Sequence, residues 1–178
     1  MKTLTDQLTQ YAAYHRDRRN VATHFAGIPM IVVAVAILLA RPRLELLGVT
    51  VSPATLAVLL SAIYYLRLDL RLGAAMAVLL AAALVLAQTL AGASTTVWLA
   101  SGIGLFVVGW VLQFIGHWFE GRKPAFVDDI MGLIIGPLFV AAEAGFAFGW
   151  RLELQQAIEA RLPPTPSAMQ HTQRSAHS

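Results

Sequence analysis

Three histidines stand where apolar segments begin or end, and together they would make a metal site. The chain has five histidines, of which His15, His24 and His117 lie at or near such ends. Imidazole is the commonest metal ligand and suits iron, zinc or copper. Taken singly, each histidine is better explained as an interfacial polar residue at a membrane boundary, and only the three together make a metal site an equal reading. His171 and His177 fall in the polar C-terminal stretch and are not expected to take part.

The spacing of these residues constrains how they meet. His15 and His24 are nine positions apart, which puts them on opposite faces of a straight helix. Both reach one centre only if the chain bends near the stretch RDRRN. Asn20 precedes His24 by four positions and shares its helix face, so we expect it to orient the His24 ring. The alternative is that Asn20 caps the N-terminus of the following helix.

Gln113, His117 and Glu120 follow one another at i, i+4 and i+7 at the end of an apolar run. This spacing places them on one face of a helix. Polar groups that face lipid are costly, so the stripe should face the interior of a bundle or water. The alternative for Glu120 is a solvated position in the following loop, whereas Gln113 lies one turn deeper.

Two further acidic positions belong to the last apolar segment. Glu143 lies inside it, where an ionisable group is a functional candidate: a metal ligand, a proton carrier or a hydrogen-bond partner for an imidazole. The alternative is a protonated acid that satisfies a neighbouring helix. Asp128 precedes this segment and is read as a loop or cap residue and as a further metal-site candidate.

The composition is that of a membrane protein. Hydrophobic residues make up 57% of the 178 residues and charged residues only 13%, against about a quarter charged in soluble domains. Cysteine is absent, which excludes thiolate sites. The lysines and arginines are scattered, so nucleic acid is not an expected partner. Walker, dinucleotide GxGxxG, GxSxG and HExxH motifs are missing as well.

The apolar pattern predicts an all-α, multi-pass bundle of four to five membrane spans with an interfacial helix near each end. One domain covers residues 1–162, and 163–178 has the composition of a disordered tail. The short run 53–66 covers about 21 Å and either crosses or re-enters. The expected spans are 21–40, 74–92, 97–116 and 130–150, with 53–66 as the fifth, and the interfacial helices are 4–14 and 151–162.

The number of crossings decides whether the histidines meet. His24 lies near the start of the first span, 21–40, and His117 directly follows the span at 97–116. An even number of crossings between them places both at the same membrane face. A shared site therefore requires that 53–66 crosses, or that another segment does not.

Two blocks carry a resemblance to a known family. The stretches YAAYHRDRRNVATHFAGIPM and LQFIGHWFEGRKPAFVDDI, followed by GPLFVAAE, resemble the Mpo1-like family. The resemblance implies Fe(II)-dependent α-oxidation, in which a 2-hydroxy fatty acid and O2 give the fatty acid one carbon shorter. It also implies His15, His24 and His117 as ligands of Fe(II), and Glu120 and Glu143 as the acidic catalytic positions.

On this hypothesis the substrate head group sits at the metal and its acyl chain lies between the spans, among membrane lipids. Its carboxylate would pair with an arginine, for which we select Arg19 and Arg122 over Arg16 and Arg18.

A bacterial inner membrane is expected, or the endoplasmic reticulum if the source is eukaryotic. The competing functions are a non-catalytic lipid-binding or scaffold protein, and a zinc-dependent lipid hydrolase with Glu120 as general base. Oligomeric state is not predicted.

Overall fold

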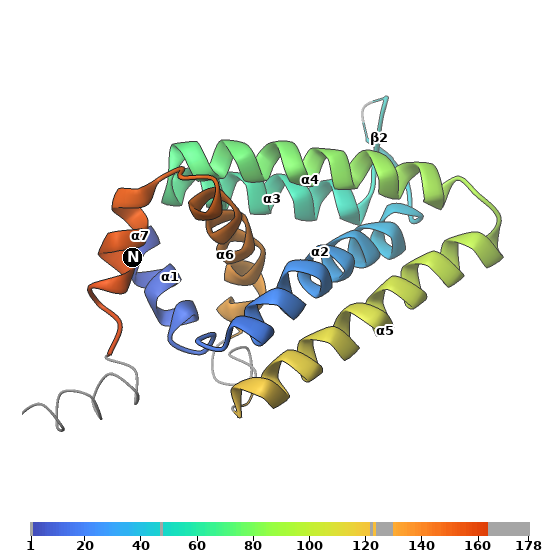
Figure 1. The fold of residues 1–178 in the computed structure, drawn as a ribbon. Coiled ribbons are helices and arrows are strands. Elements are labelled where there is room, and N and C mark those ends of the chain that lie inside the picture. Colours follow the sequence, from blue (N-terminus) through green and yellow to red (C-terminus); the bar gives the residue numbers. More distant parts are fainter. Residues whose placement is uncertain (1, 47, 122, 124–129, 164–178) are drawn as a thin grey trace, which may run out of the picture.

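The computed structural model describes residues 2–46, 48–121, 123 and 130–163 of the chain. This part is helical apart from one short β-hairpin, as Figure 1 shows. The predicted all-α class is therefore confirmed. In chain order the elements are α1 (Leu4–Ala12), α2 (Arg18–Ala40), β1 (Leu44–Leu46), β2 (Val49–Val51), α3 (Pro53–Leu68), α4 (Leu70–Ala91), α5 (Thr95–Glu120), α6 (Met131–Ala147) and α7 (Leu152–Glu159).

Three of these helices, α2, α4 and α5, are long and apolar enough to cross a membrane. Helices α6 and α7 reach that threshold only as a pair, and the chain bends by 115° between them. The described residues thus offer three spans, or four if the bent pair counts as one, where four to five were expected. The span predicted at 130–150 is shorter in the structure, because α6 ends at Ala147. The positive φ angles of Gly149 (77°) and Arg151 (59°) then separate it from α7.

Helix α3 makes the return pass that a shared histidine site needs. It has 16 residues and so covers about 24 Å, less than the roughly 30 Å of a hydrocarbon core. In Figure 1 it runs beside α4 in the opposite direction, and α2, α3, α4 and α5 traverse the bundle alternately. The start of α2 and the end of α5 consequently lie at the same end of the bundle.

Asp69 fixes the turn between α3 and α4. It ends α3 and caps α4, with its carboxylate accepting from the Leu72 backbone N–H at 2.8 Å. The Arg151 guanidinium donates to both oxygens of the same carboxylate, at 2.8 and 2.9 Å. This two-pronged pair ties the bend between α6 and α7 to the α3–α4 turn.

The hairpin of β1 and β2 joins α2 to α3 and was not expected from the sequence. The two strands are antiparallel, with Leu44 opposite Val51 and Leu46 opposite Val49. Gly48 turns the chain with a φ of 79°, a value that glycine adopts without steric cost. The hairpin lies at the end of the bundle opposite the start of α2 and the end of α5 (Figure 1).

Small residues let α2 and α5 approach closely along their length. A Cβ added to Gly109 would lie 2.9 Å from the Gly27 carbonyl oxygen, and one on Gly27 equally near the Gly109 oxygen, at 2.9 Å. Gly102 and Gly116, seven residues to either side of Gly109 on α5, also lie against α2. Helices in a membrane associate through such close packing. This contact sets the position of the α5 terminus against the first turns of α2.

The helices near the two ends of the chain pack on the bundle and on each other. Leu4 and Leu8 of α1 and Leu154 and Ile158 of α7 are buried in one cluster with residues of α6. Both helices form where interfacial helices were predicted, but their apolar faces are turned toward protein. Residues from 164 onward, which hold most of the predicted tail, lie outside the described part, and the domain limits remain a prediction.

Candidate metal centre

The three histidines converge from three separate segments. His15 lies in the turn between α1 and α2, His24 in the second turn of α2 and His117 in the last turn of α5. Their side chains are buried, with relative exposures of 5%, 0% and 6%. Their candidate ligand nitrogens all lie within 4.8 Å of one another. The predicted bend is present, since helix is interrupted between α1 and α2.

Hydrogen bonds determine which ring nitrogens point at the centre. The Nδ1 of His15 lies 2.7 Å from the Tyr11 carbonyl oxygen, and the Nδ1 of His24 lies 2.9 Å from the Asn20 carbonyl oxygen. A carbonyl oxygen only accepts, so each Nδ1 carries the proton. Each Nε2 is then left with a lone pair, and these two Nε2 atoms lie 3.1 Å apart. Two lone pairs at that distance repel each other unless a cation lies between them.

The arrangement fits a transition-metal ion. Two nitrogens bound at about 2.1 Å, at an angle of 90–109°, lie about 3.0–3.4 Å apart, and the observed 3.1 Å falls within that range. His117 supplies a third imidazole, whose buried Nδ1 has no hydrogen-bond partner among the described residues. Neutral imidazoles suit iron, zinc, copper or nickel and do not suit magnesium or calcium. The structure therefore brings together the three histidines that the sequence nominated.

The electrostatics keep His15 in its neutral form. Burial lowers the pKa of His15 to about 4, an effect that the hydrogen bond to Tyr11 opposes and the nearby His117 reinforces. A neutral imidazole is the form that binds a metal ion. His15 is thus ready to bind at neutral pH without releasing a proton.

Glu120 holds the turn that carries His15. Its two carboxylate oxygens accept from the backbone N–H of Arg16 at 2.9 and 3.0 Å, and one of them also from the Asp17 N–H at 2.9 Å. The Asn20 side-chain amide donates to the same carboxylate at 2.9 Å. Glu120 therefore clamps the α1–α2 turn and the start of α2 to the end of α5. It is not among the residues lining the cavity described below.

Asn20 orients the His24 ring through its backbone. Its carbonyl oxygen accepts from His24 Nδ1, while its side chain is bound to Glu120. The alternative reading of Asn20 as a helix cap is wrong. Asp17 caps α2 and accepts from the Arg19 backbone N–H at 2.8 Å.

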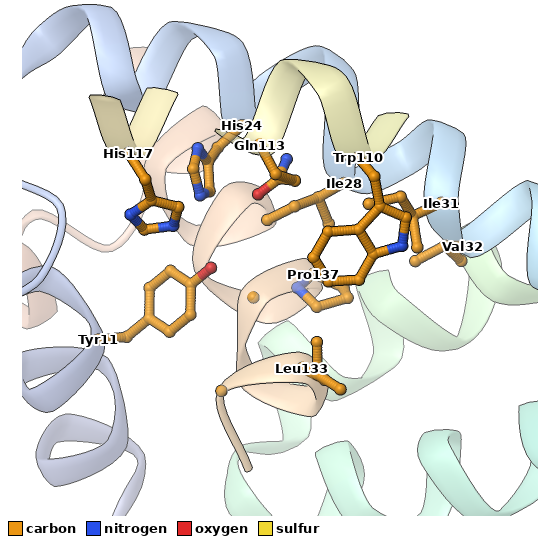
Figure 2. A pocket seen from close by; sticks show the side chains of 12 residues that line it. Tyr11, His24, Ile28, Ile31, Val32, Trp110, Gln113, His117, Leu133 and Pro137 are labelled. Carbon is orange, nitrogen blue, oxygen red and sulfur yellow. The ribbon is translucent and has the colours of Figure 1, made fainter. Parts of the chain in front are cut away.

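A cavity of about 60 Å³ opens beside His24 and His117. Figure 2 shows the Tyr11 hydroxyl and the oxygen of the Gln113 amide pointing into the same space. Gln113 is 6% exposed, and its Nε2 has no hydrogen-bond partner in the part of the chain that the structure describes. The Tyr11 hydroxyl likewise forms no hydrogen bond within the described residues. These two polar groups have no protein partners among the described residues. They stand beside His24 and His117 in a wall whose other side chains are largely apolar, and so mark a place where a ligand would bind.

The structure does not bring every nominated residue to this cavity. Glu143 does not line it and makes no hydrogen bond or ion pair within the part of the chain described. Arg19 is exposed, bonded to Asp17 at 2.8 Å and stacked over the Phe119 ring at 4.5 Å. Asp128 and Arg122 fall outside the described residues. Among the described lining residues there is no Lys, Arg, Asp or Glu.

Sequence reasoning missed two groups at the site. Tyr11, which was not among the nominated site residues, stacks on His15 with ring centroids 4.1 Å apart and an interplanar angle of 5°. The only sequence signal for this contact was that Tyr11 and His15 are four residues apart. Gly116 is the second, because a Cβ there would meet the Thr23 hydroxyl and lie 2.5 Å from Asn20 Oδ1. That close approach lets α5 reach the histidines of the α2 segment.

Comparison with known proteins agrees with this geometry. The family described as "2-hydroxy-palmitic acid dioxygenase Mpo1-like" matches residues 1–148, which include all three histidines. The 2-hydroxy-palmitic acid dioxygenase MPO1 of Saccharomyces cerevisiae is 33% identical over 159 residues, covering 88% of this chain and 87% of the yeast protein. No solved structure matches the chain. The resemblance seen in the sequence is confirmed, and the chain belongs to the Mpo1-like family.

Proposed function

We propose that this chain is an Fe(II)-dependent membrane dioxygenase that converts a 2-hydroxy fatty acid and O2 to the fatty acid one carbon shorter. The observation that carries the proposal is the pair of facing Nε2 lone pairs of His15 and His24, 3.1 Å apart and completed by His117. The yeast relative, named for the oxidation of 2-hydroxy-palmitic acid, supports the substrate class. Iron is chosen over zinc because the reaction is an oxidation by O2.

The reaction balances without a further redox cofactor. R–CHOH–COOH and O2 give R–COOH, CO2 and water. The substrate loses four electrons and O2 gains four. No reductase, flavin or nicotinamide is needed, in keeping with a sequence that has no dinucleotide motif.

The residues of the chain divide the work between holding the metal and holding the substrate head group. His15, His24 and His117 would bind the ion, which supplies the redox chemistry with O2 when bound. The Glu120 carboxylate keeps the His15 turn in place through the backbone N–H groups of Arg16 and Asp17. We assign Glu120 this positioning role in place of proton transfer.

Tyr11 and Gln113 would contact the head group of the substrate. Burial raises the pKa of Tyr11 far above its usual value, so its hydroxyl keeps its proton and is a donor. The Gln113 amide offers both a donor and an acceptor. In a cavity wall without a described arginine or lysine, these two groups are better placed than Arg19 to hold a hydroxy acid. Glu143 has no assigned role in this account.

The position of the histidine site at the ends of apolar helices suits an amphiphilic substrate. The histidines lie where a long apolar helix begins and another ends, so a polar head meets the metal while the acyl chain stays among the spans. The protein is an integral membrane protein on this account. Its location in the bacterial inner membrane or the endoplasmic reticulum remains a prediction.

The test uses protein purified in detergent. We expect anaerobic loading with Fe(II), addition of 2-hydroxypalmitate and then of O2 to yield pentadecanoate, measured by mass spectrometry. The His117→Ala variant should give none, and zinc loading should give none with wild type. Absence of product from iron-loaded wild type would reject the oxidation and favour a non-catalytic lipid-binding protein. Release of a hydrolysis product with zinc would favour a hydrolase, although Glu120 already accepts four hydrogen bonds.

A further inference from the structure

A larger apolar groove lies deeper in the bundle than the histidine cavity. Its volume is about 410 Å³, and residues of α2, α3, α4, α5 and α6 line it. Most of its lining residues are aliphatic or aromatic, and they include the small residues Ala36, Ala54 and Ala57. The Tyr65 hydroxyl at its border already donates to the Ile134 carbonyl oxygen at 2.6 Å. The surface offered to an occupant is therefore almost entirely apolar.

The groove continues the histidine cavity. Five residues from three helices line both spaces: Ile31, Val32, Trp110, Leu133 and Pro137. Figure 2 shows these side chains beside the Gln113 amide, on the side of the cavity away from His117. A molecule whose head lies at His24 and His117 can therefore extend past Trp110 into the groove.

The direction of the groove suits an extended chain. Along α2 its lining runs from Ile31 to Leu39, a rise of about 12 Å at 1.5 Å per residue. Measured from His24, the far end at Leu39 is about 22 Å along the helix axis. This length runs along α2 almost to its C-terminal end at Ala40, away from the polar end that carries the histidines.

We infer that this groove binds the acyl chain of the substrate and that its far half, at Ala36, Leu39, Ala54 and Ala57, limits the chain length. The inference rests on the proposed function for the identity of the head group. It commits to a long, unbranched hydrocarbon tail attached to a 2-hydroxy carboxylate. Burial of apolar surface provides the binding energy, with each buried methylene raising affinity about fourfold.

A second hollow is the alternative path. It has a volume of about 270 Å³ and lies among α2, α4 and α6, from Phe25 to Ala144. It shares Ile28, Val32 and Pro137 with the histidine cavity but includes no residue of α5. Because α5 carries His117 and Gln113, a chain leaving the head-group site along α5 enters the larger groove.

Photo-crosslinking tests the path without requiring turnover. A 2-hydroxy fatty acid with a diazirine at its terminal carbon is bound to metal-free protein in detergent and irradiated. We expect adducts on the peptide holding Ala54 and Ala57 or on Leu39, removed by excess unlabelled 2-hydroxy acid. Adducts at Phe25, Ala141 or Ala144 would overturn the inference in favour of the second hollow. Adducts in the groove that ordinary phospholipid removes but the hydroxy acid does not would mark it as a lipid-tail site and overturn it too.

A matched pair of substitutions tests the length limit. Ala57→Phe fills the far half of the groove, and Ala144→Phe fills the second hollow by the same volume. We expect Ala57→Phe to lower conversion of a sixteen-carbon substrate about tenfold or more relative to a ten-carbon one, since roughly two methylenes lose their site. Ala144→Phe should leave that ratio unchanged. An unchanged ratio in Ala57→Phe, or the shift appearing in Ala144→Phe, would overturn the inference.

These two experiments separate the inference from the proposed function. If wild type crosslinks in the groove but forms no shortened acid, the acyl site stands and the oxidation fails. If wild type forms the shortened acid but crosslinks elsewhere, the oxidation stands and the groove assignment fails. Should Ala57→Phe not fold, the crosslinking result on wild type decides the inference by itself.

Discussion

The Nε2 atoms of His15 and His24 face each other across 3.1 Å, each ring donating its Nδ1 proton to the carbonyl four residues earlier. The same i−4 hydrogen bond therefore fixes both tautomers. Without an ion, two lone pairs oppose each other in a buried site. With an ion, both become ligands. Much of the behaviour of this protein should follow from that relationship.

Metal binding should stabilise the purified protein. Relief of the repulsion between His15 and His24 adds to the binding free energy, and a ligand at 100 times its Kd stabilises by about 2.7 kcal/mol. Thermal unfolding in detergent should show a higher midpoint with Fe(II) or Zn(II) than without. His24→Ala should abolish the shift. An equal shift in that variant would mean that the ion binds elsewhere.

Loss of the Glu120 clamp should weaken the metal site without unfolding the chain. Glu120→Gln replaces one carboxylate oxygen, which accepts hydrogen bonds, with an amide NH2 group. The hydrogens of that group would face the backbone N–H groups of Arg16 and Asp17. Partners that orient metal ligands typically contribute 10–100-fold in affinity, and we expect a loss of about that size. Competition with a chelator measures it. Glu153→Gln, at an exposed position of α7, is the control and should bind iron as wild type does.

Gly116 should tolerate no side chain. A Cβ there would lie 2.5 Å from Asn20 Oδ1 and 3.2 Å from His24 Nδ1. Gly116→Ala should destabilise the protein by about 1–3 kcal/mol, the usual cost of overpacking, and should lower the iron content. Gly104→Ala, on the same helix with nothing within 4 Å, should change neither. Normal iron binding by Gly116→Ala would show that the α2–α5 contact does not control the site.

Tyr11 and Gln113 should matter for turnover and not for metal content. Tyr11→Phe preserves the stacking on His15 and removes only the hydroxyl; Gln113→Leu removes the amide. A hydrogen bond to a charged group contributes about 1.5–3 kcal/mol, so kcat/KM should fall by about 10–100-fold in each variant. Iron per chain is measured alongside. A parallel loss of iron would indicate that these side chains only support the fold.

The metal-free protein should lose stability as the solution is acidified through the histidine range. The folded pKa of His15 is lowered to about 4, below the ordinary value of 6.5. A lowered histidine pKa favours the neutral form, so its stabilisation is complete above pH 6.5 and is lost as the pH falls toward 4. From pH 7 to pH 5 this amounts to about 2 kcal/mol for His15. Unfolding measured at both values should show a smaller difference in His15→Gln than in wild type.

The histidine site was predictable because its spacing rules are local. A separation of nine between His15 and His24 required a bend, and the helix is interrupted there. A separation of four between Gln113 and His117 placed both on one face, and both are buried. Counting the crossings required either that 53–66 makes a return pass or that another segment does not cross, and in the structure α3 runs back along the bundle.

Other features were not predictable because they depend on distant partners. Glu120 accepts from backbone N–H groups 103 and 104 positions away, and no periodicity signals such a bond. Glu143 looked functional because it is ionisable within an apolar segment, yet it does not line the cavity. The bend after α6 depends on the positive φ of Arg151. A non-glycine residue rarely adopts that conformation, so the bend could not be predicted from the sequence.

Iron stoichiometry tests the central claim most directly. Wild type, His15→Ala, His24→Ala, His117→Ala and His171→Ala are loaded anaerobically with Fe(II), freed of excess metal and assayed for iron per chain and for pentadecanoate from 2-hydroxypalmitate. We predict about one iron and turnover for wild type and His171→Ala, and loss of both in the other three. Turnover by iron-free wild type, or full iron retention in all three cluster variants, would contradict the account.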